Sequence, residues 1–324
     1  MKTKTKVLMI ISLSLLVAGL IVACIGVTLM DFNFLMLNTT KTVTKTHTVT
    51  EDFHSISISE NTSDVVFLPS EDETVRIVCN EQKKVKHSVS VQNGVLTVKL
   101  VDTRKWYDYI TIFNFGKYKT TVYLPKDTYK NVTVKTNTGD INMPDGYIFE
   151  NASLSVDTGD VSWSADVSGA LRIESDTGDV KIANAAVGSL KLESDTGDVK
   201  IEKINATGIF NVETDTGDIR MTNVNCGDLK LEADTGNIAL TDTLATAQIN
   251  IETDTGDVKF TRSDAATISV KTDTGNVTGS FLTDKIIHAK SSTGNVSVPE
   301  LTTGGKCTVR SSTGNIRLEI ENAK

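Results

Sequence analysis

The residues of this chain with the clearest chemical potential are the aspartates of a recurring Asp-Thr-Gly motif, which is also the signature of aspartic proteases. In those enzymes two such aspartates face each other across a cleft and share a proton. Nothing marks two copies here as a pair, because seven occur at nearly equal spacing: Asp157, Asp176, Asp195, Asp215, Asp234, Asp254 and Asp273. The sequence therefore predicts no protease, no catalytic residue and no cofactor.

Calcium binding is a second chemistry open to these acids. Another set of aspartates follows the glycines, at Asp140, Asp160, Asp179, Asp198, Asp218 and Asp257. If the copies stack, like charges lie about 4.8 Å apart, and Ca²⁺ would relieve their repulsion. However, asparagine replaces aspartate at Asn237, Asn276, Asn295 and Asn315 without disturbing the spacing, which a turn tolerates and a charged ligand does not. Calcium remains a minor alternative, and no residue is predicted to bind a metal.

Turn chemistry explains the motif without a ligand. The aspartate can accept a hydrogen bond from the backbone two residues later, and glycine supplies the positive φ of a type II or bulged turn. Thr-Gly recurs ten times, always 19 or 20 residues apart, with its glycines at Gly139, Gly159, Gly178, Gly197, Gly217, Gly236, Gly256, Gly275, Gly294 and Gly314. The motif is therefore predicted to form the corners of a repeat.

Each repeat has the pattern of two strands that share one interior. Around Gly197, Leu190 and Leu192 alternate with polar residues before the corner, and Val199 and Ile201 continue the apolar set after it. One coil cannot bury this face alone, so the coils must stack in parallel. The predicted fold class is all-β: a single-stranded parallel β-solenoid (β-helix) with about 20 residues per coil, regular over residues 131–320.

The N-terminal segment predicts attachment to a membrane. Three lysines lie in residues 1–6, and residues 7–30 contain no charge over 24 positions. A helix of that length crosses a hydrocarbon core of about 30 Å. The lysines favour a cytoplasmic tail (1–6), a single transmembrane helix (7–30) and an extracytoplasmic remainder. A cleaved signal peptide is one alternative. A lipoprotein acylated at Cys24 is another, because Ile21-Val-Ala-Cys24 resembles a bacterial lipobox.

The segments between the helix and the regular repeat are predicted to be a linker (31–48) and an irregular β cap with the first coils (49–130). Seven of the chain's aromatic residues lie between Trp106 and Tyr123. They form either a hydrophobic plug on the first coil or a flap that binds a sugar or a partner. At the C-terminus, charges at Arg317, Glu319 and Glu321 are expected to discourage edge pairing, which predicts a monomer.

The net charge, the cysteines and the histidines limit the classes of partner and site that the sequence predicts. A net charge of −8 excludes nucleic acid as an expected partner. The cysteines (Cys24, Cys79, Cys226 and Cys307) form neither a zinc motif nor a disulfide framework, and the last two occupy inward positions as buried thiols. The histidines (His47, His54, His87 and His288) have no metal-ligand spacing and no evident nucleophile partner.

Together these motifs resemble a known family. Val132 to Ile141, followed by repeated Asp-Thr-Gly-Asp-Val, is similar to the bacterial β-strand-repeat family called putative adhesins. Phe53 to Ile58, Asn93 to Val98 and Thr121 to Pro125 resemble its upstream landmarks, so the resemblance covers most of residues 49–320. One departure is Ser63-Asp64, where the family commonly has Gly-Asp. The resemblance implies a membrane-anchored β-solenoid of unknown function at the surface of a Gram-positive bacterium, near envelope-stress genes in some members, and it supplies no catalytic residues.

Three functions remain open at this point. The first is a non-catalytic, adhesin-like interaction or scaffold protein, whose partner is a cell-envelope component or a membrane protein. The second is a sensor or regulator of envelope stress. The third and weakest is a polysaccharide-acting β-helix enzyme, because such enzymes interrupt their repeats with long loops and this spacing never leaves 19 or 20 residues.

Overall fold

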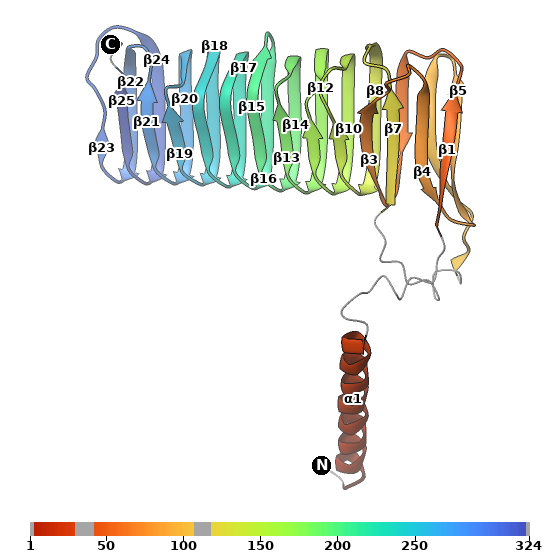
Figure 1. Cartoon of the computed structure of the whole chain (residues 1–324). Coiled ribbons are helices and arrows are strands. Elements are labelled where there is room, and N and C mark those ends of the chain that lie inside the picture. The colour runs from red at the N-terminus through yellow and green to blue at the C-terminus, as the bar shows by residue number, and fades with distance from the viewer. Residues whose placement is uncertain (1–2, 30–41, 107–117, 322–324) are drawn as a thin grey trace. The chain divides into compact units, whose positions relative to one another are not determined.

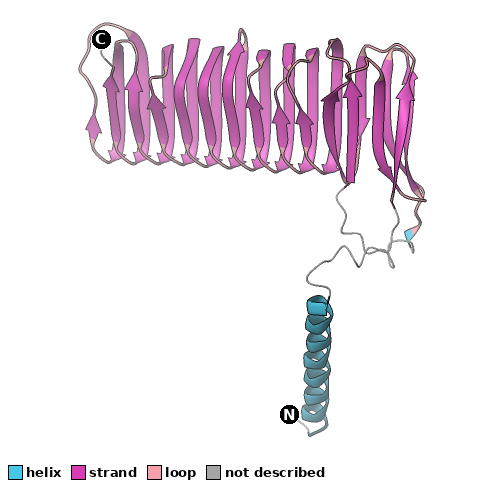
Figure 2. Ribbon diagram, in the orientation of Figure 1, coloured by secondary structure: helices cyan, strands magenta, loops and turns pink. Residues whose placement is uncertain are grey.

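The computed structural model describes residues 3–29, 42–106 and 118–321, with the side chains of the helix from Met9 onward. Within these residues it has one helix, α1 (Thr3–Leu29), and twenty-five strands (Figures 1 and 2). The chain divides into two units. One contains α1 with residues 42–43, 81–86 and 102–106, and the other contains the rest of the β structure. Each unit is described by itself.

Helix α1 is long and apolar enough to cross a membrane. Its segment Met9–Leu29 has a mean hydropathy of 2.8, and none of its most apolar window is buried among the described residues. The hydroxyl groups of Ser14 and Thr28 donate to carbonyls at Ile10 and Cys24, one turn earlier, so these polar groups are satisfied within the helix. The helix fits a single-pass anchor or a signal sequence. Residues 1–2 of the predicted tail and 31–41 of the predicted linker lie outside the described residues.

The second unit is a parallel β-solenoid, as predicted, with strands in two stacked rows. The row before the Thr-Gly corners contains β2 (Ser55–Ser59), β6 (Val95–Asp102), β8 (Thr128–Thr138), β10 (Ile148–Thr158), β12 (Asp166–Thr177), β14 (Ala186–Thr196), β16 (Ile209–Thr216), β20 (Asp264–Thr274), β22 (Lys285–Thr293) and β24 (Gly305–Thr313). The row after the corners contains β3 (Ser63–Pro69), β7 (Tyr118–Leu124), β9 (Ile141–Met143), β11 (Val161–Trp163), β13 (Val180–Ala183), β15 (Val199–Ala206), β19 (Val258–Thr261), β21 (Val277–Phe281), β23 (Val296–Ser297) and β25 (Ile316–Ile320). Two long strands, β17 (Ile219–Thr235) and β18 (Ile238–Thr255), contribute to both rows.

The core is a set of ladders in which each buried residue lies against its equivalent in the next coil. One ladder runs through Leu171, Leu190, Phe210, Leu229, Ile249, Ile268 and Cys307, all buried. Stacking therefore buries an apolar face that no single coil could bury. A second corner, which the sequence analysis missed, is marked by left-handed residues at Asn184, Lys203, Asn223, Asp242 and Arg262.

The order of coils along the stack departs from the order of the sequence at both ends. At one end β2 lies between β6 and β8, and β3 lies between β7 and β9. Two further strands, β1 (Val43–Val49) and β4 (Val75–Glu81), pair there, and β4 runs antiparallel to β7. Strand β5 (Val85–Gln92) precedes the Asn93-Gly94 turn, where both residues are left-handed.

At the other end the last coil is inserted inside the stack. Strand β24 pairs with β20 on one side and β22 on the other, and β25 likewise lies between β21 and β23. The expectation that the C-terminal residues form the free edge is therefore wrong. Within the described residues the edge strands are β22 and β23, and the charges at Arg317 and Glu319 belong to an internal coil.

A buried ion pair spans the inserted strand. Lys285, the first residue of β22, lies 2.5 Å (Nζ to Oδ1) from Asp264, the first residue of β20, and both side chains are at least nine-tenths buried. Between them lies Gly305, where an added Cβ would come within 3.4 Å of the lysine Nζ and 3.3 Å of its Cδ. The absence of a side chain at Gly305 lets the lysine cross β24. This pair therefore links β20 to β22 across the inserted strand.

Candidate functional site

The Thr-Gly corners stack so that the residue after each glycine forms a continuous column along one edge of the solenoid. Asp160 Oδ1 accepts a hydrogen bond from Asp179 N at 2.8 Å, and Asp179 Oδ1 accepts one from Asp198 N at 2.9 Å. We call this column the post-glycine ladder. Its acceptors, in stack order, are Asp64, Asp140, Asp160, Asp179, Asp198, Asp218, Asn237, Asp257, Asn276 and Asn315.

This ladder explains the motif differently from the predicted Asx-turn. Among the described residues, the aspartate before Thr-Gly makes no hydrogen bond to its own turn, so that prediction is wrong. The structural acceptor is instead the residue after the glycine. Carboxylates and carboxamides both carry an acceptor oxygen, which is why either aspartate or asparagine can occupy this position.

Close stacking also explains the glycine of the motif. Gly159 has φ 146°, and a Cβ there would lie 2.6 Å from the carbonyl carbon of Gly139. Gly256 is not in the left-handed region, yet a Cβ there would meet Gly236 in the same way. Ser63 holds the first glycine position of this column, and the strand on its other side begins at Tyr118 rather than at a glycine corner. A Cβ is therefore tolerated at Ser63.

The outer face of the row before the corners carries two further columns of acids. Five successive coils place glutamate three residues before the corner threonine and aspartate one residue before it: Glu174 and Asp176, Glu193 and Asp195, Glu213 and Asp215, Glu232 and Asp234, and Glu252 and Asp254. Several glutamates pair with neighbouring cations, as in Arg172–Glu193 and Lys230–Glu232. The aspartates are exposed. Surface pairs of this kind contribute at most about 1 kcal/mol each.

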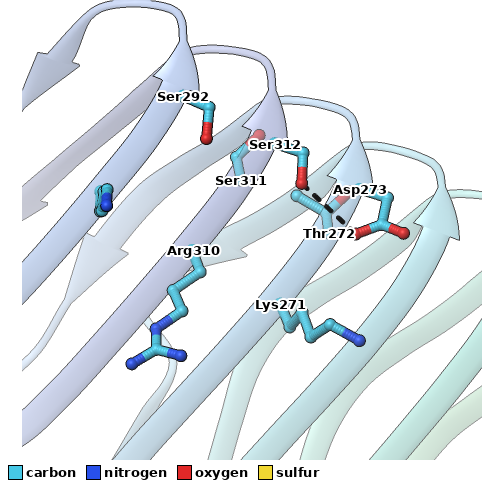
Figure 3. A pocket seen from close by; sticks show the side chains of 8 residues that line it. Lys271, Thr272, Asp273, Ser292, Arg310, Ser311 and Ser312 are labelled. Carbon is cyan, nitrogen blue, oxygen red and sulfur yellow. Dashed lines mark hydrogen bonds between the residues drawn. The ribbon is translucent and has the colours of Figure 1, made fainter.

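The charge of this face reverses at the end where the last coil is inserted, and Figure 3 shows Lys271 and Arg310 on neighbouring strands there. The positions that carry glutamate elsewhere hold Lys271, Arg310 and Lys290 on the neighbouring strands β20, β24 and β22. A surface hollow of about 440 Å³ lies over these strands. The last two corners replace the exposed aspartate by Ser312 and Ser292, and Ser312 Oγ donates to Asp273 Oδ1 at 3.5 Å.

A buried acid–base cluster lies near the other end of the solenoid. His87 Nε2 is 3.0 Å from Glu60 Oε1, and Thr120 Oγ1 donates to the same oxygen at 2.7 Å. Cys79 is also within hydrogen-bond reach of His87. Burial alone lowers the pKa of His87, but the hydrogen bonds to Cys79 and Glu60 and the charge of Glu60 outweigh it and raise this pKa to about 10.

This cluster corrects the expectation that no histidine has a nucleophile partner. Residues His87 and Cys79 lie on adjacent strands in the sequence, β5 and β4, while Glu60 follows β2, so no local motif indicates the cluster. Its histidine and glutamate side chains are 1% and 0% exposed. A thiol, an imidazole and a carboxylate are thus brought together, but without access for a substrate from solvent.

Other predicted features have mixed outcomes. Cys226 and Cys307 are buried free thiols, as predicted, and burial raises their pKa values to about 11 and about 12. Within the aromatic segment Trp106 to Tyr123, Trp106 is 77% exposed and Tyr118 is buried, while residues 107–117 lie outside the described residues.

Several aromatic residues that pack inside the solenoid lie outside this segment. Tyr129 stacks on Phe53 at 6.1 Å and on Phe149 at 5.8 Å between ring centroids, and Phe149 also contacts Trp163 at 5.8 Å. These side chains belong to the first coils of the repeat. Burial of the Tyr147 ring beside them raises the pKa of that phenol to about 12.

The acidic columns do not form a recognisable metal centre. Over residues 3–29, 42–106 and 118–321, no group of three or more His, Cys, Asp or Glu side chains is placed to hold a metal ion. In the post-glycine ladder, one oxygen of each acceptor already receives an amide N–H.

Comparison with solved structures finds matches of low sequence identity. A putative adhesin from Bacteroides fragilis NCTC 9343 is 18% identical, with a TM-score of 0.46 over 86% of this chain and 97% of its own. A putative adhesin from Parabacteroides distasonis ATCC 8503 is 13% identical, with a TM-score of 0.44 over 86% of this chain and 98% of its own. A protein from the same organism described as a putative lipid binding protein is 14% identical, with a TM-score of 0.30 over 87% and 98% of the two chains.

Sequence comparison is more decisive. No curated protein matches the chain. The family model described as Toastrack DUF4097 matches residues 53–223 and again residues 208–324. These matches include the opening strand and all ten Thr-Gly corners, and they confirm the predicted resemblance to a β-strand-repeat family of unknown function. Because they cover well over half of the sequence, the chain belongs to the Toastrack DUF4097 family.

Proposed function

We propose that the chain is a non-catalytic, adhesin-like scaffold, anchored to the membrane by α1, that presents the side of its solenoid to a component of the cell envelope. The observation that carries this proposal is the repetition of identical outward columns. Five successive coils expose the same pair of acidic positions, on strands whose pairing is continuous from β10 to β20. A surface that repeats at about 4.8 Å suits a repetitive partner.

The chemistry of the described residues supports a binding role over an enzymatic one. The acids of the outer columns have equivalent surroundings in successive coils, so none is set apart as a general acid or base. The cluster of Glu60, His87 and Cys79 is closed to solvent. Catalysis requires a group that can reach its substrate.

Two measurements on the full chain test the proposal. In the first, a C-terminal epitope tag is labelled on intact cells that express the chain; labelling without lysis is expected. In the second, the detergent-solubilised chain is immobilised and offered isolated cell envelopes, beside a control with residues 1–48 alone. Retention by the full chain and not by the control is expected. A tag that is reached only after lysis, or equal retention by both, would contradict the proposed function.

A further inference from the structure

The hollow over β20, β24 and β22 departs in charge from the rest of the outer face. From β12 to β18, each coil contributes two acids at the two outward positions before the corner threonine. At β20 these positions hold Lys271 and Asp273, at β24 they hold Arg310 and Ser312, and at β22 they hold Lys290 and Ser292. The formal charge of these two positions is therefore −2 in each coil from β12 to β18, 0 at β20, and +1 at both β24 and β22.

Two of the three cations of the hollow are not consumed by internal ion pairs. Lys271 pairs with Glu252 on the neighbouring strand. Among the described residues, Arg310 and Lys290 have no carboxylate partner. Both lie on an outer face of an acidic protein, so their charge is available to a ligand.

Ser292 and Ser312 of the hollow stand where other corners of the repeat have aspartate. Ser312 is the cross-strand neighbour of Asp273, and Ser292 is the neighbour of Ser312. Seven earlier corners have aspartate at the equivalent position, and aspartate at these two positions would place a negative charge beside Arg310 and Lys290. Serine instead adds a hydroxyl donor that points to the same side of the strand (Figure 3).

From this arrangement we infer that the hollow binds the phosphate groups of a phosphodiester polymer. The Arg310 guanidinium, the Lys290 ammonium and the Ser292 hydroxyl supply more donors than a carboxylate can accept at once, and they match the oxygens of a phosphate. The row of Lys271, Arg310 and Lys290 covers about 10 Å across three strands, which is longer than a single phosphate. The site therefore takes more than one group along a chain.

This inference rests on the proposed function, because it assigns one envelope chemistry to one end of the scaffold. The body of the solenoid, with its acidic columns, repels the same polymer. Asp273 marks the boundary between the two surfaces. The polymer is therefore held at the end of the solenoid that contains β22, and not along its side.

The test is a titration of the full chain in a neutral detergent with poly(glycerol phosphate), inorganic phosphate and poly-glutamate. The polymer is expected to bind at least about tenfold more tightly than the other two, because hydrogen bonds to charged groups contribute this much each. Added salt should weaken the binding. Equal affinity for poly-glutamate, or equal affinity for inorganic phosphate, would overturn the assignment to a phosphodiester polymer.

The decisive variant is the double substitution Ser292→Asp and Ser312→Asp. It should fold, because aspartate occupies this position in seven other corners of the same repeat. It is expected to lose at least about tenfold in affinity for the polymer, since each new carboxylate lies beside a binding cation. The matched control, Ser153→Asp with Ser155→Asp, adds the same charge to the outer face of β10 and should bind normally.

Three further outcomes keep the inference separate from the proposed function. Asp273→Asn should tighten polymer binding, and unchanged or weaker binding would contradict the inference. An equal loss of polymer affinity in the Ser153/Ser155 control would show that net charge alone causes the effect, and this would overturn the inference. Vesicles of phosphatidylglycerol that bind as tightly as the polymer would overturn the polymer assignment. If the Ser292/Ser312 variant keeps its affinity for the polymer, the inference is wrong. If the same variant still retains cell envelopes, the proposed scaffold function is not contradicted.

Discussion

A single hydrogen bond, from a backbone amide to a side-chain oxygen one coil away, is repeated along the whole corner edge of this protein. It requires an oxygen acceptor but no charge, and aspartate and asparagine both satisfy it. Where the acceptor is aspartate, a further cation can pair with the free oxygen: Arg220 Nη1 lies 2.8 Å from Asp198 Oδ2. The amide of Asp218 and the Arg220 side chain together hold the pKa of Asp198 below its usual range.

The ladder predicts a clear difference between two substitutions at Asp179. Asp179→Asn keeps the acceptor for the amide of Asp198 and should be nearly neutral. Asp179→Ala removes it and should cost about 1 kcal/mol. Hydrogen exchange at the Asp198 amide is the direct measurement, and about fivefold faster exchange is expected in the alanine variant alone. Equal exchange in both variants would show that the ladder does not protect this amide.

At the scale of elements, the inserted strand β24 depends on a buried charge pair. Lys285 also donates to Thr283 Oγ1 at 2.5 Å, and Asp264 accepts from the backbone amides of Thr283 and Ala265. The pair is therefore well satisfied, although burial makes it costly to leave one partner alone.

Breaking this pair should loosen the last coils. Lys285→Met leaves the Asp264 carboxylate buried without its counter-ion and is expected to cost about 3–5 kcal/mol. The double variant with Asp264→Asn should recover part of that loss. Hydrogen exchange over β20 to β25 measures the effect locally, and a double variant no better than the single one would contradict a direct coupling.

The cluster around His87 gives the first coils a pH dependence. The folded-state pKa of about 10 lies above the ordinary value of 6.5, so the folded protein holds this proton more tightly than the unfolded chain does. The resulting stability is complete below pH 6.5 and is lost as pH rises towards 10.

Thermal melting followed by circular dichroism should therefore show a falling Tm between pH 6.5 and pH 10. The double variant Glu60→Gln with His87→Gln removes both charges and should have a flatter profile over that window. The other histidines are unchanged in this variant and serve as an internal control. An equally steep decline in the variant would assign the effect to groups outside the cluster.

At the scale of the molecule, the sequence was sufficient for the repeat and insufficient for its ends. The Thr-Gly spacing and the alternation around Gly197 report which side chains face inward, and those are the features that the structure confirms. They do not report which coil lies next to which, because any two coils present the same ladder to a neighbour. The insertion of β24 depends on Gly305 and on the Lys285–Asp264 pair, and neither stands out in the sequence.

The candidate sites show the same division. The regular spacing of the Asp-Thr-Gly motif identifies the columns of acids. It does not show that the residue after the glycine, rather than the one before it, accepts the backbone hydrogen bond from the next coil. Glu60 and His87 are 27 residues apart on separate elements, so only the fold brings them together. The basic hollow was within reach of the sequence, because Lys271, Lys290 and Arg310 occupy equivalent positions in three consecutive coils and lie on neighbouring strands in either stacking order.

The edge strand bears on the oligomeric state. Strand β22 has a partner on one side only within the described residues, but it carries Lys290, and Val298 packs against the core beside it. Charged, partly covered edges resist pairing with a second copy. Light scattering of the full chain in detergent should give one chain per micelle, and a stable dimer at micromolar concentration would contradict this.

The inserted coil also determines how the protein responds to force. Because β25 is hydrogen-bonded to β21 on one side and to β23 on the other, a pull on the C-terminal end cannot peel away an outermost layer. It must slide an internal strand between two neighbours, so many hydrogen bonds have to break together instead of one after another. A tether attached at that end would therefore hold under loads that would unzip a solenoid whose last coil was also its outermost.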